Sequence, residues 1–274
     1  MLTKFRLSAF VVISSVLSYF IVAQGVVNWT IVTLLALGGI CVTGAANVLN
    51  QILERDYDKH MQRTKDRPLA AERLKLSAAV LFAGLLLLSG SIFLALINPL
   101  TVMISMISLI LYAFVYTPLK RYSTIAVGVG AIPGALPVLI GTTAFSGSLT
   151  TLGLILFGIQ FLWQFPHFWS IGYLAFEDYK KAGYKLLPMD GEGNINKNLG
   201  YHSFVYSLVL IAVSAIPFAM GSMTLIPFLL VMLIGILYAA ACLQFQWNST
   251  RKTALTLMFS SFFYLPLVLS FFLI

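Results

Sequence analysis

The chain has 274 residues, of which 59% are hydrophobic and only 9% are charged, and its formal net charge is +8. A water-soluble globular domain of this size could not hide so much apolar surface, so the composition excludes that class of protein. Apolar stretches of about 18–25 residues, the length that crosses a bilayer as a helix, recur along the chain. Backbone groups in lipid must be satisfied within each segment. We therefore expect an all-α polytopic membrane protein, in contact with the lipid bilayer and not with nucleic acid.

Nine membrane spans are predicted in chain order, near residues 8–26, 29–50, 76–98, 100–117, 124–144, 150–174, 202–220, 223–243 and 254–273. The first follows Lys4 and Arg6 and has signal-peptide character, but because many spans follow we interpret it as an uncleaved helix. No Arg- and Ser-rich transit peptide precedes it, which favours a bacterial plasma (inner) membrane. Cys41 and Cys242 lie within spans and are expected to be small buried hydrophobic residues.

All charged residues are predicted to lie on one side of the bundle. The 17 Lys and Arg residues fall at 4–6, 55–75, 120–121, 180–197 and 251–252, and the nine acids fall within 54–72 and 177–192. With nine spans these segments share one side, and the positive-inside rule makes that side cytoplasmic. The N-terminus is then expected inside and the C-terminus outside. Membrane orientation accounts for the positions of the basic residues. It does not require acids, so the clustering of the acids in two segments needs another explanation.

The acids of the first cluster form a pattern with an amide. Asn50, Glu54 and Asp58 recur every four residues at the end of the second span. On a helix each such step rotates the side chain by only about 40°, so the three side chains form one stripe. Mg²⁺ prefers oxygen ligands and often takes one or two carboxylates together with substrate phosphate oxygens. A solvated helix end with mixed charges is the alternative interpretation.

Basic residues follow this stripe directly. Lys59, Arg63, Lys65 and Arg67 come after Asp58, and the guanidinium groups of Arg63 and Arg67 can bind phosphate bidentately. Lys120 and Arg121 lie at the same surface after the fourth span, where anchoring to anionic lipid headgroups is an alternative role. Acids that can hold a hard metal ion, next to cations that can hold phosphate, predict a diphosphate site.

The fifth and sixth spans carry polar or helix-bending residues inside the membrane. Pro133 and Pro137 in the fifth invite a kink, so this span either packs tightly or bends around an internal cavity. In the sixth, Gln164 and His167 are costly in lipid and are expected to face the bundle interior. His167 is either a satisfied structural histidine or a substrate contact. Trp163 and its aromatic neighbours either line a cavity, where they could stabilise a carbocation, or form an interfacial belt.

Taken together, these segments resemble the UbiA-type intramembrane prenyltransferases, and within them the branch that farnesylates haem. The motifs extend from the second span to the loop after the sixth, roughly half of the chain. They are Asn50-x3-Glu54-x3-Asp58-x2-Met61-x-Arg63-Thr64-x2-Arg67-Pro68-Leu69, Tyr116-Thr117-x-Leu119-Lys120-Arg121, Gly134-Ala135-x-Pro137-x2-Ile140-Gly141, Trp163-Gln164-x-Pro166-His167-Phe168, Asp178-Tyr179-x2-Ala182-Gly183 and Leu187-Pro188.

The resemblance implies one prenyltransferase domain over residues 1–274, with a central cavity that opens toward the cytoplasm and active-site loops at about 51–75 and 177–200. It implies farnesyl diphosphate and haem B as substrates, haem O and pyrophosphate as products, and Mg²⁺ as cofactor. Haem A synthase and oxidase assembly proteins are candidate contacts.

The resemblance also assigns roles to individual residues. The implied catalytic metal ligands are Asn50, Glu54, Asp58 and Asp178. The implied diphosphate ligands are Arg63, Arg67, Tyr116, Lys120 and Arg121. The implied acceptor pocket contains Trp163, Gln164 and His167.

Two departures from the family pattern affect the metal count. Glu54 stands where the family usually has Asp, and Asp178 has Leu174 and Ala182 at four-residue spacing instead of a second acid. One Mg²⁺ is therefore expected, with a second only if Glu177 substitutes for the missing acid. An aromatic acceptor such as 4-hydroxybenzoate is an alternative substrate. A transporter is a more distant alternative, disfavoured because no Asp, Glu, Lys or Arg lies at midspan.

Overall fold

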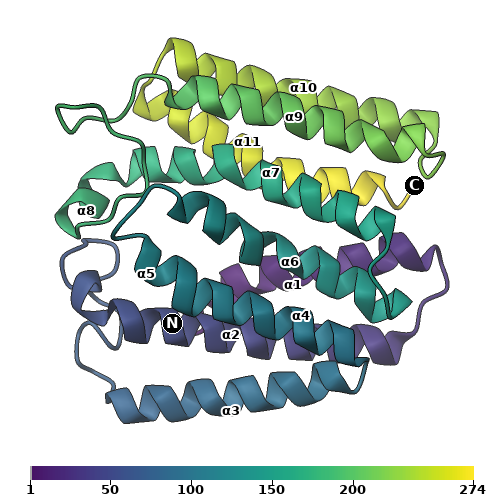
Figure 1. The fold of residues 1–274 in the computed structure, drawn as a ribbon, viewed down its shortest axis with the longest axis horizontal. Helices are drawn as coiled ribbons and strands as arrows, with labels where there is room; N and C mark the ends of the chain where they lie inside the picture. The colour runs from purple at the N-terminus through teal and green to yellow at the C-terminus, as the bar shows by residue number, and fades with distance from the viewer. Residues whose placement is uncertain (1) are drawn as a thin grey trace.

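The computed structural model describes residues 2–274, which form helices and the connections between them and contain no β-strand. Figure 1 shows the long helices running alongside one another. In chain order the helices are α1 (Phe5–Ala23), α2 (Trp29–Asp58), α3 (Leu76–Ala95), α4 (Pro99–Ile110), the π-helix η1 (Leu111–Tyr116), α5 (Thr117–Leu119), α6 (Ala126–Ser146), α7 (Thr151–Leu174), α8 (Phe176–Lys181), α9 (Leu199–Ala219), α10 (Leu225–Trp247) and α11 (Arg251–Phe271).

The predicted all-α membrane fold is confirmed, while the predicted number of nine spans is approximate. Eight helices within residues 2–274 are long and apolar enough to cross a membrane, and α4, η1 and α5 together make one of them. The sixth predicted span, α7, has 24 residues but does not belong to these eight. Gln160, Gln164 and His167 lower its hydropathy, and the structure buries all three inside the bundle.

Polar side chains begin several of these helices. The Asn28 side chain accepts hydrogen bonds from the backbone N–H groups of Thr30 and Ile31, at 3.0 and 3.3 Å, and so caps α2. Thr150 caps α7 in the same way, and Thr250 caps α11 with a reciprocal Thr253 contact. These caps satisfy N–H groups that a helix end otherwise leaves unpaired.

The second helix continues beyond its membrane span. The span was predicted to end near residue 50, and the stripe of Asn50, Glu54 and Asp58 required the helix to extend into the loop at about 51–75; α2 does so and ends at Asp58. Gln51, Leu53, Glu54 and Arg55 are good helix formers, no Gly or Pro interrupts residues 51–58, and Arg55 in the last turn suits the negative end of the helix dipole. Glu54 and Asp58 are therefore helical residues in fixed register with Asn50. The second predicted loop, at 177–200, likewise begins as helix, because α8 continues to Lys181.

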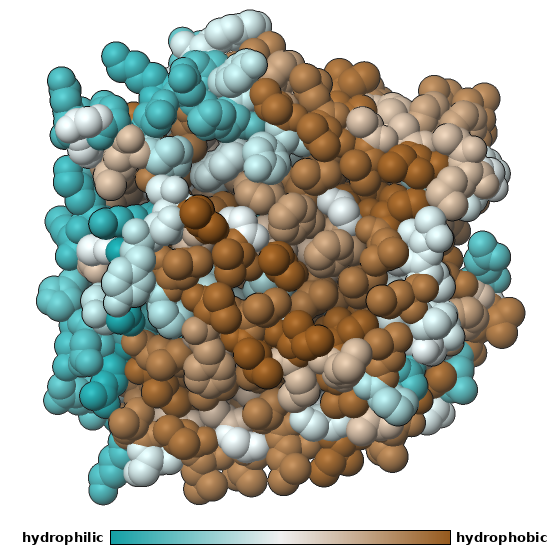
Figure 2. Space-filling view, viewed as in Figure 1, coloured by the Kyte–Doolittle hydropathy of each residue, from teal (hydrophilic) through white to brown (hydrophobic). Residues whose placement is uncertain are grey.

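Hydrophilic residues gather at one end of the molecule, and the surface beyond them is mainly apolar on the face shown in Figure 2. The N-terminus lies toward this end and the C-terminus toward the other (Figure 1). This arrangement agrees with the prediction that all charged segments lie on one side of the bundle. The apolar belt is the surface that a multi-pass membrane protein presents to lipid.

Helix α6 lies at the centre of the bundle. The structure buries 78% of its span, against 22–44% for the other spans. A Cβ atom added at Gly141 would lie 1.9 Å from the Ser15 carbonyl oxygen, so only glycine permits this approach of α1. Pro137 removes the N–H that would bond the Pro133 carbonyl, and Ser108 Oγ donates to that carbonyl instead at 3.1 Å. The tight packing predicted for this helix is therefore present, and both prolines also line the internal cavity.

Candidate functional site

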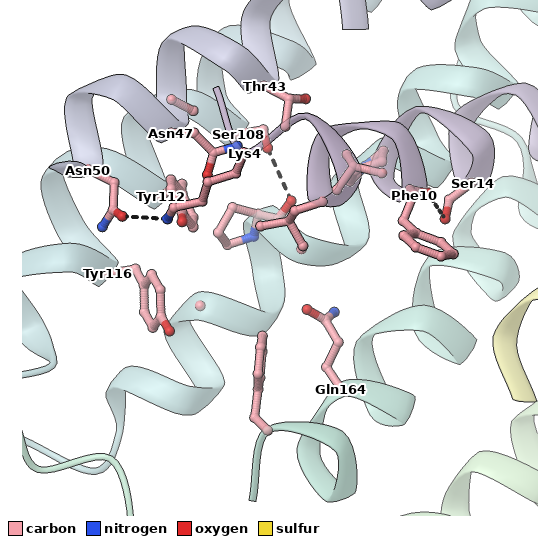
Figure 3. A pocket seen from close by; sticks show the side chains of 18 of the residues that line it. Lys4, Phe10, Ser14, Thr43, Asn47, Asn50, Ser108, Tyr112, Tyr116 and Gln164 are labelled. Atoms are coloured by element: carbon pink, nitrogen blue, oxygen red, sulfur yellow. Dashed lines mark hydrogen bonds between the residues drawn. The ribbon is translucent and has the colours of Figure 1, made fainter. Parts of the chain in front are cut away.

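A cavity of about 390 Å³ lies inside the bundle, between α1, α2, α4, η1, α6, α7 and α11. Its charged residues concentrate where α2 ends, and most of its exposed lining surface is apolar. Figure 3 shows Lys4 of the N-terminal segment, Asn50 of α2, Tyr112 and Tyr116 of η1 and Gln164 of α7 facing this space. A pocket with a charged end and an apolar remainder suits an amphiphilic ligand.

The predicted stripe on α2 lines this cavity. Asn50, Glu54 and Asp58 are only 1%, 4% and 1% exposed, so the alternative of a solvated helix end is wrong. Buried carboxylates require partners. Glu54 accepts a short hydrogen bond from Lys120 Nζ, and Asp58 accepts from Arg67 Nη1 at 2.7 and 2.9 Å. Each carboxylate is thus paired with a predicted diphosphate ligand.

Three of the predicted diphosphate ligands besides Arg67 also line the cavity. The Lys120 ammonium is buried 4.7 Å from the centre of the Tyr116 ring, which excludes lipid anchoring as its role. Arg63 is exposed at the cavity edge and donates to the Tyr179 hydroxyl at 3.2 Å. These cations come from segments far apart in the sequence and meet only in the fold.

Arg121, by contrast, is not among the residues that line the cavity. It donates to the Leu53 carbonyl at 3.0 Å, and its guanidinium lies 3.7 Å from the centre of the Tyr57 ring. These contacts hold the end of the fourth span against α2, so the structure places Arg121 in packing and not at the polar end of the cavity.

The second acidic segment is also outside the cavity lining. Glu177 is exposed, and neither it nor Asp178 lines the cavity. Within residues 2–274 no cluster of three or more His, Cys, Asp or Glu side chains could hold a metal ion. The structure therefore does not bring Asp178 to the stripe on α2. This loop instead contributes Tyr179 and Tyr184, which do line the cavity.

Lys4 and Tyr184 are lining residues that the sequence did not reveal. Lys4 Nζ donates to Asn50 Oδ1 at 2.9 Å, and burial, with nearby Arg67 and Lys120, lowers the pKa of Lys4 to about 7. Burial beside Glu54 raises the pKa of Tyr184, which keeps its hydroxyl protonated. In the sequence, Lys4 indicated only the orientation of the first span. Tyr184 directly follows the matched Ala182-Gly183 motif but does not belong to it.

The predicted acceptor residues lie together on α7. Gln164 donates to the Ala131 and Gln160 carbonyls, at 2.9 and 3.1 Å, and so fastens α7 to α6. Trp163 stacks on His167 with ring centres 4.7 Å apart, and its Nε1–H donates to the Ser261 carbonyl. All three line the cavity, so an interfacial belt does not describe Trp163.

The contacts around Ser261 favour one tautomer of His167. Ser261 Oγ donates its hydrogen to the Met258 carbonyl, and it lies 2.7 Å from His167 Nδ1. With its one hydrogen on that carbonyl, Ser261 would accept from His167, an arrangement that favours the proton on Nδ1 and a free lone pair on Nε2. A ring nitrogen with a free lone pair can bind a metal ion or accept a hydrogen bond, but it cannot donate one.

The donor set at the polar end fits one hard cation. Asn50, Glu54 and Asp58 offer an amide and two carboxylates from one helix face, which are ligands that Mg²⁺ prefers. The cavity lining also contains four Lys and Arg side chains, namely Lys4, Arg63, Arg67 and Lys120, against only these two carboxylates. The site is therefore net positive and suited to a multiply charged anion.

Known proteins resemble this chain along nearly its whole length. Residues 11–265 match the UbiA prenyltransferase family. The protoheme IX farnesyltransferase of Cytophaga hutchinsonii is 42% identical over 269 residues, which cover 97% of this chain and 93% of the relative.

Two solved structures share the fold. A structure of digeranylgeranylglyceryl phosphate synthase superposes with a TM-score of 0.83 at 20% identity, and covers 99% of this chain and 95% of its own. A UbiA homolog from Archaeoglobus fulgidus bound to GPP and Mg²⁺ superposes with a TM-score of 0.62 at 16% identity, and covers 98% of this chain and 99% of its own.

Proposed function

This chain belongs to the UbiA prenyltransferase family, and from that premise we propose that it transfers a farnesyl group from farnesyl diphosphate to the vinyl group of haem B. The products are haem O and pyrophosphate. The observation that carries the proposal is a cavity with an excess of cations at one end and an apolar remainder inside the membrane. The 42% identity to a protoheme IX farnesyltransferase supports haem as the acceptor.

The polar end would bind the diphosphate when two cations exchange their carboxylate partners for phosphate oxygens. Lys120 and Arg67 are held by Glu54 and Asp58, and a diphosphate could take over both cations. Asn50, Glu54 and Asp58 would then be free to hold Mg²⁺, and the Mg²⁺ found with GPP in the Archaeoglobus fulgidus homolog supports divalent-ion use. When bound, this ion supplies Lewis-acid neutralisation of the leaving group. Asp178 as a fourth ligand and a second ion remain predictions.

The apolar remainder of the cavity would hold the farnesyl chain. Breaking the bond between its first carbon and the diphosphate oxygen leaves an allylic cation and pyrophosphate. The Tyr112 and Tyr116 rings from the π-helix line the cavity near Lys120, and their negative faces can stabilise that cation. The enclosing helices keep out water that would otherwise capture it.

The haem would lie toward α7 and α11. Its vinyl carbon forms the new bond to farnesyl, and a water molecule then adds its oxygen to the resulting cation and releases a proton. His167 Nε2, with its free lone pair, suits the haem iron rather than a propionate, because a propionate would need a donated proton. Trp163 and Gln164 hold His167 and its helix in place.

We further propose that residues 1–274 form one prenyltransferase domain of the bacterial plasma membrane. The polar end in Figure 2 would face the cytoplasm, with the N-terminus inside and the C-terminus outside. Contact with haem A synthase or with oxidase assembly proteins remains a prediction. Protease accessibility of tags placed at the two termini, in sealed membranes, would measure the orientation.

One experiment tests the reaction and its acceptor together. The purified protein receives radiolabelled farnesyl diphosphate with either haem B or 4-hydroxybenzoate. We expect label only on haem, and loss of transfer in excess chelator. Label on 4-hydroxybenzoate alone would refute the acceptor, and undiminished transfer in chelator would refute the metal. In the same samples, His167→Ala should change the absorption spectrum of bound haem B, and added imidazole should restore it.

A further inference from the structure

The polar end of the cavity contains two cations that no carboxylate neutralises. Lys120 and Arg67 are paired with Glu54 and Asp58, respectively. Arg63 and Lys4 form no ion pair with any residue in the described range 2–274. Lys4 Nζ is satisfied only by the Asn50 amide oxygen, at 2.9 Å. A cation enclosed without a counter-charge is costly, and a bound anion would offset that cost.

The position of Lys4 is built by the segment before α1. The Leu2 carbonyl accepts from Gln51 Nε2 at 2.6 Å, and the Thr3 carbonyl accepts from Ser8 Oγ at 2.8 Å and from Asn47 Nδ2 at 3.2 Å. Lys4 itself has a φ of 46°, in the left-handed region that few non-glycine residues adopt. Figure 3 shows its side chain reaching Asn50. Strain of this kind persists where surrounding contacts fix a functional group.

Tyr184 presents a second polar group beside these cations. Its side chain lines the cavity and is only 7% exposed, and its hydroxyl lies beside the Glu54 carboxylate without forming a hydrogen bond of normal geometry. Its ring centre lies 5.6 Å from the Lys120 ammonium. A buried hydroxyl is normally hydrogen-bonded, and a bound anion beside Lys120 would offer this one an acceptor in addition to Glu54.

We propose that the Lys4 ammonium and the Tyr184 hydroxyl are two further ligands of the substrate diphosphate. The inference rests on the proposed function, and it adds residues from the N-terminal segment and from the connection between α8 and α9. An ammonium has three donors, so Lys4 can keep Asn50 and still donate to phosphate oxygens. The diphosphate would then contact the segment before α1 and the connection between α8 and α9, in addition to Arg63, Arg67 and Lys120.

The test compares Lys4→Met and Tyr184→Phe with two matched controls. Arg6→Met removes the same charge from an exposed side chain two residues away, and Tyr122→Phe removes a hydroxyl from a side chain that is 72% exposed. We measure KM for farnesyl diphosphate, KM for haem B, and the dissociation constant of pyrophosphate with Mg²⁺. Lys4→Met should weaken both diphosphate constants at least about tenfold, the effect of losing one charged hydrogen bond. Tyr184→Phe should weaken them about threefold, as for a neutral bond, and KM for haem B should not change.

The outcomes separate this inference from the function. Wild-type affinity for pyrophosphate in Lys4→Met, or an equal loss in Arg6→Met, would overturn it, even if the wild type transfers farnesyl to haem. Lys4-dependent pyrophosphate binding in a wild type that fails to transfer farnesyl would support it and refute the function. Lys4→Arg should keep most of the affinity, which excludes a folding defect.

Anionic lipid is the other source of phosphate oxygens. The measurement is therefore repeated in nanodiscs of phosphatidylcholine with and without phosphatidylglycerol. The effect of Lys4→Met on pyrophosphate binding should be the same in both. If Lys4→Met had an effect only in the nanodiscs that contain phosphatidylglycerol, Lys4 would be a ligand of the lipid headgroup, and the inference would be overturned.

Discussion

The two acidic segments of this protein look alike in the sequence and differ in the structure. Glu54 and Asp58 lie on the last two turns of α2, are buried in the cavity and are each paired with a cation. Glu177 and Asp178 lie on the six-residue helix α8, outside the cavity lining. Acids four residues apart on a long helix share a face, whereas adjacent acids point about 100° apart. Spacing on a continuous helix, rather than the number of acids, decides which segment builds a site.

The largest expected effect comes from removing one buried carboxylate. Asp58→Asn should reduce turnover by about 10²- to 10³-fold, because it removes charge that binds the diphosphate's counter-ion and positions Arg67. Farnesyl transfer to haem measures this. The control is Asp56→Asn on the same helix, whose side chain is 67% exposed and should be dispensable. Equal activity of the two variants would remove the distinction between buried and exposed acids.

The second prediction concerns stability. Lys120→Met leaves Glu54 buried without its cation and should lower the free energy of unfolding by about 3 kcal/mol. Adding Glu54→Gln should recover most of this loss. Reversible unfolding in mixed micelles measures both variants. Glu72→Gln breaks an exposed pair with Lys59 in the same charged segment and should have no measurable effect.

The smallest effect is expected in the second acidic segment. Asp178→Asn should reduce turnover less than about tenfold, because Asp178 does not line the cavity. The same farnesyl transfer assay measures it. A loss as large as that of Asp58→Asn would show that the loop closes over the site and that Asp178 is the fourth metal ligand that the sequence predicts.

Part of the site could be predicted because it depends only on the spacing of residues along one helix. The i, i+4, i+8 pattern of Asn50, Glu54 and Asp58 needs only helical geometry to become a stripe. The cations that pair with it could be named but not placed. Lys120 and Arg121 are neighbours in the sequence, yet one enters the cavity and the other stacks on Tyr57. Their directions depend on the π-helix before them and on the packing of α5 against α2.

The sequence by itself determined that this is a helical membrane protein with its charge at one end and an acidic stripe at the end of its second helix. Those properties follow from apolar length and helical period, which are local. Only the tertiary structure decided that Lys4 and Tyr184 join the cavity, that Arg121 and Asp178 do not line it, and that Ser261 contacts the His167 ring. Each of these depends on contacts between segments distant in the chain, and no local pattern encodes which side chains the packing of helices will bring together.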